Sequence, residues 1–527
     1  MRYSKKIRAP KSNGAWLIAS SARAKDPLQT NQAWSQHFSE THAELGELRR
    51  QAKSELLLAA QQYSAKFIDT DSLNLRSNRP FILSGHQPEF FHPGVWFKNF
   101  LLNRLARQMS AAPINLIIDN DECSDALISM PAGTLASPHR ETIEFDSLME
   151  PLPFENRPRL DPTVLSQFVT TIQSNMAAMS DHAMIVEALP GLDDVDKPTS
   201  LLGEWVAQIR YQLEIEQGLT NLEVPLSKVC QGRAFCTFAA GILRDAERFQ
   251  TTYNRSLLDF RQRNKLRSQT HPVPNLVKTG DWIELPFWLW SEASPQRGPL
   301  YAQRQQNEIE ISDLDQLSFK LAINDLAEEI HSLQEQRVAI RPRALMTTMY
   351  SRLFLSDLFV HGIGGAKYDE LTDALVREYF GAEPPLFLTA TSTHHLPFPL
   401  LPFDENCARD IRQELRTRRF SPEKFLNQES LAETTRQGLI DKQQLLAEIP
   451  ARGQKRCWHT KMEAVNQSLW EVSRTDYEDR RSELVSLEKK RRHTELLLSR
   501  EYSFLLHPPS LCGDLMRIAG QAAKEFD

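Results

Sequence analysis

Residues 81–125 read FILSGHQPEF FHPGVWFKNF LLNRLARQMS AAPINLIIDN DECSD, and this stretch decides the fold. Phe81–Gly85 and Ile114–Ile118 are short apolar runs of the kind that form buried strands. Between them, Trp96–Met109 places apolar residues at the spacing of a helix. The order strand, loop, helix, strand predicts a right-handed βαβ unit, and therefore a parallel sheet in an α/β protein.

Periodicity predicts further elements on both sides of this unit. An amphipathic helix is expected over residues 31–68, and the proline-rich run 150–160 is interpreted as a linker. The other expected helices cover 199–217, 234–264, 317–336, 345–360 and 367–380, and the other expected strands cover 183–186, 282–290, 338–340 and 386–390.

The composition changes near residue 404, where glycine becomes scarce and charge rises. Half of the residues from Val472 to Glu501 are charged, which predicts a long solvated helix, and an apolar row that includes Trp470 and Tyr477 runs along it. An antiparallel hairpin and an intermolecular coiled coil both fit this pattern, and the coiled coil would make the protein a homodimer. We therefore divide the chain into an N-terminal helical segment (1–74), an α/β core (75–403) with inserted segments at about 150–335, and a C-terminal helical region (404–527).

Composition excludes several classes of protein. The 527 residues carry 62 Lys and Arg against 68 Asp and Glu, a net charge of −6, so a chain-wide basic field for nucleic acid is absent. No apolar run approaches the ~20 residues of a membrane span, and the N-terminus lacks the apolar core of a signal peptide. Six scattered cysteines without a CxxC pair suit a reducing compartment. We predict a cytoplasmic protein that acts on a small molecule, without nucleic-acid or membrane partners.

The loop between the first strand and its helix is the first candidate for chemistry. Ligands of parallel sheets bind beyond the carboxyl ends of the strands, and the helix near Trp96 offers unpaired N–H groups there. His86 and His92 could stabilise developing negative charge, while Gly85 and Gly94 would allow the backbone to approach a ligand. We expect His86→Ala to lower turnover at least tenfold with an unchanged melting temperature. The alternative is that both histidines are ordinary loop residues.

The second strand runs directly into acidic residues. Asp119 and Asp121 follow Ile118, and adjacent parallel strands end at the same edge, so we expect these carboxylates to face the histidine loop. They could bind a ribose hydroxyl, a substrate amine or Mg²⁺, or act as a general base. The alternative is a solvated acidic loop that caps the next element.

A second basic and glycine-rich region lies further along the chain. Arg341 and Arg343 flank a proline after a strand, and arginine forks suit carboxylate or phosphate oxygens. Lys367 follows Gly364 and Gly365 near a helix start and could reach another anionic group. The alternative is that the arginines pair with neighbouring carboxylates. The chain has no HExxH zinc helix, and we predict no metal site of its own.

These motifs resemble those of the bacillithiol cysteine-adding enzyme family. In that family a strand leads to a Gly-Gln-Gln-rich loop, a helix and another strand with an acidic end. Here Leu83–Lys98 correspond to the strand, loop and helix, and Asp119–Asp125 correspond to the acidic strand end. The stretch from Arg341 through Gly364-Gly365 to Tyr379 is similar to that family's Arg-Pro and Gly-Gly stretch. The resemblance covers about residues 75–505.

The resemblance implies a class I nucleotidylyltransferase-like Rossmann core with inserted segments and a C-terminal coiled coil. Gly85 and Gln87 match the family loop, whereas His86 stands where the family has Gln and Lys367 where it has Gly. From the residue patterns and the resemblance together, the candidate catalytic residues are His86, His92, Asp119 and Asp121, and the candidate substrate- or nucleotide-binding residues are Gly85, Gln87, Gly94, Lys98, Arg341, Arg343, Gly364, Gly365 and Lys367.

Three functions follow as hypotheses. The first is an enzyme of the cysteine-adding type, which joins an amino compound to a sugar-linked or carboxylate-bearing small molecule. The second is a nucleotidyltransferase on the same core, and the third is a non-catalytic scaffold whose C-terminal helices bind partners. The cofactor stays open, with ATP or ADP and magnesium as the candidates.

Overall fold

Two compact units make up the chain in the computed structural model, which describes residues 8–19, 26–147, 149–159, 162–177, 201–268, 270–400, 403–426, 431–448, 450–451, 453–472 and 474–526. The first unit comprises Met1–Met130, Glu141–Leu396 and Arg500–Asp527, and the second comprises Pro131–Arg140 and Pro397–Ser499. The predicted division put all of 404–527 into one region, whereas residues 500–527 return to the first unit.

A mostly parallel sheet forms the centre of the first unit, so the prediction of an α/β protein is confirmed. Its strand order is β1-β16-β15-β2-β3-β8, in which β1 is an antiparallel edge strand and the other five strands are parallel. The strands are β1 (Gly14–Ala19), β2 (Phe81–His86), β3 (Ala112–Ile117), β8 (Leu222–Pro225), β15 (Leu358–His361) and β16 (Phe387–Thr393).

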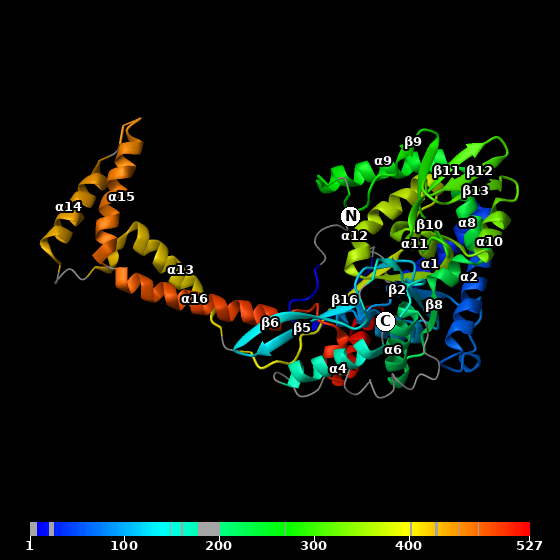
Figure 1. Cartoon of the computed structure of the whole chain (residues 1–527), viewed down its shortest axis with the longest axis horizontal. Coiled ribbons are helices and arrows are strands. Elements are labelled where there is room, and N and C mark those ends of the chain that lie inside the picture. The colour runs from blue at the N-terminus through cyan, green and yellow to red at the C-terminus, as the bar shows by residue number, and fades with distance from the viewer. Residues whose placement is uncertain are drawn as a thin grey trace. The chain divides into compact units, whose positions relative to one another are not determined.

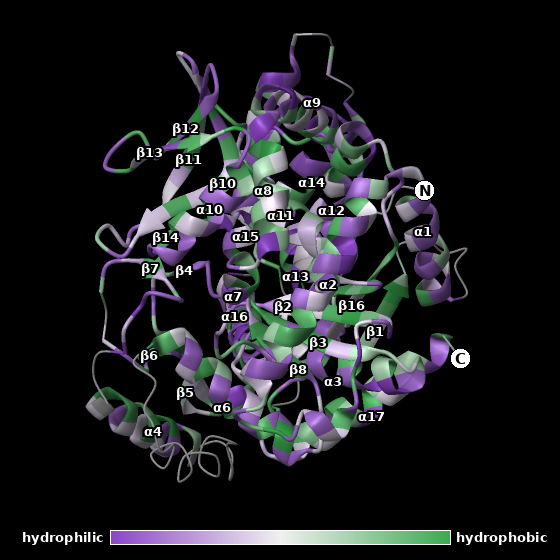
Figure 2. Ribbon diagram, turned by 90° about the vertical axis from the view of Figure 1, so that its right-hand side faces the viewer, coloured by the Kyte–Doolittle hydropathy of each residue, from purple (hydrophilic) through white to green (hydrophobic). Residues whose placement is uncertain are grey.

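Helices cover both faces of this sheet. Figure 2 shows α3 and α17 on one side of β2, β3 and β16, and α2 and α12 on the other. The strands β2, β3 and β16 are buried along almost their whole length, so β3 and the first half of β2 read as mostly apolar runs, whereas β16 (FLTATST) also buries hydroxyl side chains. The helices of this unit are α1 (Pro27–Thr41), α2 (Ala43–Ser64), α3 (Pro93–Gln108), α4 (Pro162–Ala177), α6 (Leu202–Glu216), α7 (Leu226–Cys230), α8 (Arg233–Arg244), α9 (Ala246–Asn264), α10 (Leu326–Glu335), α11 (Ala344–Tyr350), α12 (Ile363–Leu375) and α17 (Ser510–Ala523).

The chain leaves the two central strands in opposite directions. From β2 it passes through α3 to β3, as the βαβ prediction has it, and from β15 it passes through α12 to β16 on the other side. Because β2 and β15 are parallel neighbours, their carboxyl ends lie together at the point where the strand order reverses. Such a topological switch point is the usual ligand site of an open parallel sheet.

A second, antiparallel sheet adjoins the first within the same unit, with strand order β13-β12-β11-β10-β14 and with β9 beside β10. The aromatic strand predicted at 282–290 is β10. The strands are β9 (Lys278–Thr279), β10 (Trp282–Ser291), β11 (Gly298–Gln305), β12 (Glu308–Ser312), β13 (Ser318–Ala322) and β14 (Val338–Pro342). Two further pairs are β4 (Glu122–Cys123) with β7 (Leu152–Pro153), and β5 (Leu127–Thr134) with β6 (Ser137–Glu144).

Two predicted helices are wrong in part. The predicted helix 317–336 begins with strand β13, because Ser318–Ala322 pairs with β12, and only α10 is helical. The predicted helix 345–360 ends in a π-helical stretch at Leu355, and β15 follows. Asp357 stabilises the transition from helix to strand, because its carboxylate accepts the N–H of Phe81 (2.7 Å) and pairs with Arg49 (2.8 Å). Contacts distant in sequence therefore decide the local structure.

Two other predicted helices are each divided by a short break. The helix predicted at 31–68 is α1 and α2, separated at His42, and the one at 234–264 is α8 and α9, separated at Asp245. The predicted linker 150–160 contains β7. The predicted strand 183–186 lies outside the described residues.

The second unit consists mostly of helices, which run from yellow to orange-red in Figure 1, together with parts of β5 and β6. Within it α13 packs against α16, and α14 packs against α15. Trp470 and Tyr477, two members of the predicted apolar row, are in ring contact with centroids 5.6 Å apart. The helices are α13 (Glu405–Phe420), α14 (Glu433–Ala447), α15 (Lys455–Val472) and α16 (Arg474–Leu497).

Candidate functional site

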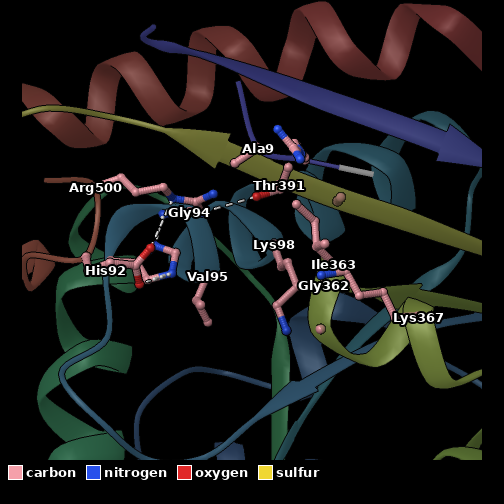
Figure 3. Close-up of a pocket in the computed structure, with 14 residues that line it drawn as sticks. Ala9, His92, Gly94, Val95, Lys98, Gly362, Ile363, Lys367, Thr391 and Arg500 are labelled. Atoms are coloured by element: carbon pink, nitrogen blue, oxygen red, sulfur yellow. Dashed lines mark hydrogen bonds and ion pairs between the residues drawn. The ribbon is translucent and has the colours of Figure 1, made fainter. Parts of the chain in front are cut away.

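A cavity of about 390 Å³ lies at the switch point, between the first turns of α3 and α12 and beside β16 (Figure 3). Its position beyond the carboxyl ends of β2 and β15 is the one that the βαβ prediction assigned to a ligand. The predicted site residues that line it are His92, Gly94, Lys98, Gly364 and Lys367.

Two helix N-termini border this cavity. His92 caps α3, because its Nδ1 accepts the N–H of Gly94 at 3.0 Å. At α12 the cap residue is Gly362, which has no side chain to accept the first N–H groups. The positive end of the α12 dipole and its uncapped N–H groups therefore remain available for an anion.

The glycines of the site serve different purposes. A Cβ on Gly364 or Gly362 would meet nothing within 4 Å, so these residues leave the backbone of α12 open to a ligand. A Cβ on Gly94 would overlap the Ser392 carbonyl oxygen and the Arg500 guanidinium, so only glycine fits there. Gly94 therefore allows close packing at the wall of the cavity.

Lys98 is the most constrained cation of the cavity. Its side chain is 5% exposed, its Nζ donates to the Gly85 carbonyl oxygen at 2.8 Å, and the described residues provide no ion-pair partner for it. Burial lowers the pKa of this amine to about 8. A buried ammonium without a counter-ion favours a bound anion, because a ligand carboxylate or phosphate would neutralise it.

The remaining charged groups of the cavity are mostly basic as well. Arg8, Lys367 and Arg500 line it, and among the described residues of its lining Glu501 alone carries a carboxylate. This carboxylate lies 3.6 Å from His92 Nε2 and 3.5 Å from Arg500 Nε. The cavity therefore has an excess of positive charge.

His92 is neutral near pH 7, since burial lowers its pKa to about 4 even though Glu501 acts in the opposite direction. Its Nδ1 accepts the hydrogen bond of the α3 cap, which places the proton on Nε2. His92 is thus equipped to donate a hydrogen bond through Nε2 rather than to take up a proton at neutral pH.

His86 does not line the cavity, contrary to its predicted catalytic position. It is buried, its Nε2 lies 3.1 Å from Asn99 Oδ1, and its ring packs edge-on against Phe91. Burial lowers its pKa well below the usual value, so it is neutral and Nε2 donates to Asn99. Asn99 donates in turn to Glu214 (2.7 Å), which also accepts from Trp96 (2.7 Å). His86 therefore belongs to a buried polar network under α3.

The acidic strand end meets the histidine loop through Gln87. Its Nε2 donates to Asp121 Oδ2 at 2.9 Å, and Arg297 pairs with the other oxygen of Asp121 at 3.0 Å. Asp119 instead accepts hydrogen bonds from the backbone N–H and the hydroxyl of Ser227 and lines a different cavity. Asp121 thus faces the histidine loop as expected, but Asp119 and His92 line different cavities and do not form one site.

Arg341 and Arg343 also lie away from the switch-point cavity. Arg341 forms a two-pronged ion pair with Glu155 (2.8 and 2.9 Å), and Arg343 pairs with Glu284 (2.8 Å) above the ring of Trp288. The alternative, that these arginines pair with carboxylates of neighbouring elements, is confirmed, because paired and buried guanidinium groups are already neutralised.

Two predicted glycines have packing roles. A Cβ on Gly365 would lie 2.6 Å from His361 Nδ1, and one on Gly85 would lie 3.1 Å from Leu116 on β3. Each allows close packing of its own element rather than an approach to a ligand. Gly85 still contributes to the site through its carbonyl oxygen, which accepts from Lys98.

Sequence reasoning missed Arg8, Gly362, Thr391 and Arg500, all of which line the cavity. Thr391 could have been found, because it lies near the carboxyl end of a predicted strand. Arg500 Nη2 donates to Thr391 Oγ1 at 3.3 Å, although 109 residues separate them, and no spacing in the sequence indicates this contact.

Comparison with models of protein families finds no match, and no curated protein matches the chain significantly. Within the described residues, no three or more His, Cys, Asp or Glu side chains are grouped in a way that could hold a metal ion. None of the described helices is both long enough and apolar enough to cross a bilayer.

Proposed function

We propose that the chain is a ligase or transferase that joins an amino compound to a sugar-linked or carboxylate-bearing small molecule, and that an anionic group of the substrate or of a nucleotide binds in the switch-point cavity. The proposal includes the finer fold assignment, a Rossmann-like core of the class I nucleotidylyltransferase type. It is supported by the motifs that resemble the cysteine-adding family and by the order β16-β15-β2-β3, which reverses at the cavity.

One observation supports the binding of an anionic ligand in this cavity. The buried ammonium of Lys98 has no carboxylate partner among the described residues, and it lies on the same cavity as the uncapped start of α12. Neither feature stabilises the protein by itself, because the Lys98 ammonium has no counter-ion among the described residues and the first N–H groups of α12 have no side-chain cap. Both would be satisfied by one carboxylate or phosphate group.

The residues then have separate roles. Lys98, Lys367 and the α12 N–H groups would hold oxygens of the anion, and His92 Nε2–H would donate to negative charge that develops at the transferred group. Glu501 stands beside His92 and Arg500 as an internal counter-ion that an anionic ligand would replace.

A nucleotide fits this donor set better than a protein-bound magnesium ion does. ATP or ADP would present phosphate oxygens to the cations, whereas Mg²⁺ takes one or two carboxylates together with phosphates and water. Within the described part of the lining, Glu501 is the sole carboxylate, and it is already paired with Arg500. We therefore assign no step to magnesium.

Binding by the full chain tests the anionic ligand. We expect ATP or ADP to bind in calorimetric titration, and at a hundredfold excess over Kd either should add ~2.7 kcal/mol to the free energy of unfolding, whereas adenosine should add little. Lys98→Met should weaken binding at least tenfold, and Lys320→Met, which removes an exposed charge from β13, should not. Equal affinities for ATP and adenosine, or an unchanged affinity in Lys98→Met, would contradict the proposal.

Turnover distinguishes the reaction types. An enzyme of the cysteine-adding type should form the adduct of cysteine and a glucosaminyl-malate acceptor, detected by mass spectrometry. Release of pyrophosphate from a nucleoside triphosphate with magnesium, without an adduct, would favour the nucleotidyltransferase. The scaffold predicts a loop packed shut without a cleft, and the open cavity beside His92 argues against it.

A further inference from the structure

A second and larger cavity, of about 850 Å³, lies where β3 and β8 end. Its walls come from the start of α6, from α7, from the turn after β7 and from the nearby edge of β10 and β14. It shares no lining residue with the switch-point cavity. Like that cavity, it lies beyond the carboxyl ends of parallel strands, where open sheets bind ligands.

Most charges of this second cavity neutralise one another. Its lining includes four acidic and four basic side chains, and three pairs form among them. The pairs are Lys66 with Glu204 (3.4 Å), Arg337 with Glu292 (3.9 Å) and Arg341 with Glu155 (2.8 Å). The two that remain are Asp119, which is buried, and Lys228, which is exposed.

Asp119 is a buried carboxylate that lacks a cation. Ser227 donates to both of its oxygens, through the backbone N–H to one and through the hydroxyl to the other. Each oxygen can accept a further hydrogen bond, and no ion pair of the described residues involves Asp119. The carboxylate of Glu155 acts on it electrostatically, and the backbone N–H of Glu155 donates to the Asp119 carbonyl oxygen at 2.8 Å.

The groups that face Asp119 determine when it is charged. Burial and, to a smaller extent, the Glu155 carboxylate raise its pKa, whereas Ser227 and Arg341 lower it, and together they bring the pKa of Asp119 to about 7. The thiol of Cys230 and the phenol of Tyr63 also face it, and burial keeps both neutral. An ammonium ion at Asp119 would supply the missing counter-charge.

We propose that this second cavity is a binding site for a small molecule with a primary ammonium group, which pairs with Asp119. Tyr63, Phe154 and Trp290 provide aromatic surface for the rest of the ligand. The ammonium group can belong to a simple amine or to an amino acid, whose carboxylate would then meet Lys228. The inference concerns a separate cavity and does not depend on the proposed reaction.

Calorimetric titration of the full chain with matched probes tests this site. The probes are benzylamine, its neutral analogue benzyl alcohol and the zwitterion L-phenylalanine. We expect benzylamine to bind at least tenfold more tightly than benzyl alcohol at about pH 8.5. Its affinity should fall roughly tenfold at about pH 6, where most Asp119 is protonated while benzylamine keeps its charge. The affinity of benzyl alcohol should not change with pH.

Two variants place the effect at Asp119. Asp119→Asn should weaken benzylamine binding at least tenfold and remove its pH dependence, while Glu292→Gln, which removes an exposed carboxylate from the same lining, should change the affinity less than twofold. Tighter binding of L-phenylalanine than of benzylamine would support an amino acid, and the reverse would support a simple amine.

The inference would be overturned if benzyl alcohol bound as tightly as benzylamine, if the affinity of the wild type for benzylamine did not change with pH, or if Asp119→Asn bound like the wild type. Should Asp119→Asn fail to fold, the pH series on the wild type decides by itself. These measurements use neither a nucleotide nor turnover, so their failure is distinct from failure of the proposed function.

Discussion

Lys98, a single buried lysine, contributes positive charge to the switch-point cavity and makes the stability of the protein depend on pH. Because burial holds the pKa of Lys98 at about 8, the unfolded chain binds this proton more tightly, and stability should rise as pH increases from about 8 to 10.5. The difference between the pKa of about 8 in the folded protein and the ordinary lysine value of 10.5 corresponds to about 3 kcal/mol in the free energy of unfolding. Lys98→Met should lack this rise, as measured by urea denaturation over that pH range. Lys320→Met should follow the wild type, and parallel curves for wild type and Lys98→Met would contradict the argument.

His86 has a structural role, because its hydrogen bond and its ring contact are both made inside the protein. Its imidazole is buried against Phe91 and donates to Asn99, so His86→Ala leaves a cavity and an amide oxygen without a donor. We expect a loss of about 2–4 kcal/mol in the free energy of unfolding, rather than the unchanged melting temperature expected from the sequence. A double-mutant cycle with Asn99→Ala should show coupling between the two side chains. Unchanged stability with strongly reduced turnover would restore a catalytic role for His86.

At the scale of elements, the start of α3 and the start of α12 tolerate a methyl group differently. In Gly94→Ala the new Cβ would overlap the Ser392 carbonyl oxygen, so we expect a loss of about 1–3 kcal/mol and a narrower cavity. Gly364→Ala is the matched control, since its Cβ meets nothing within 4 Å and alanine favours a helix more than glycine does. Chemical denaturation of both variants measures the difference. Equal stabilities of the two variants would contradict this prediction, because they would show that Ser392 and Arg500 move aside to accept the methyl group.

The sequence predicts an element well where a local pattern marks it, and poorly where distant contacts decide it. β2, α3 and β3 could be predicted because an apolar run or an apolar helical face marks each of them locally. β13 could not, because the edge strand Ser318–Ala322 continues into a helical pattern and gains its structure from pairing with β12. At the site, the loop and Lys98 could be predicted. The inward turn of His86 and the pairing of Arg341 with Glu155 depend on partners distant in sequence.

At the scale of the whole molecule, the last residues of the chain complete the first unit. The N–H of Phe504 donates to the Phe91 carbonyl oxygen at 2.9 Å, and its ring packs against that of Trp96 with centroids 4.3 Å apart. Helix α17 then packs against α3 and β1. The helix α3, which begins at the switch point, is therefore supported by residues about 400 positions away in sequence, and the cavity should be sensitive to them.

A chain that ends at residue 400 tests this dependence. It would lose Phe504 and the buried face of α17, and because each fully buried apolar side chain contributes about 1.5–3 kcal/mol, the loss should exceed the ~5–15 kcal/mol that keeps a typical domain folded. We expect residues 1–400 to lack a cooperative denaturation curve and near-ultraviolet circular dichroism. In the full chain, Phe504→Ala should cost about 3–5 kcal/mol, whereas Leu446→Ala, at an exposed position of α14, should cost little. Cooperative unfolding of residues 1–400 at the midpoint of the full chain would mean that the two parts are separable, as the scaffold hypothesis requires.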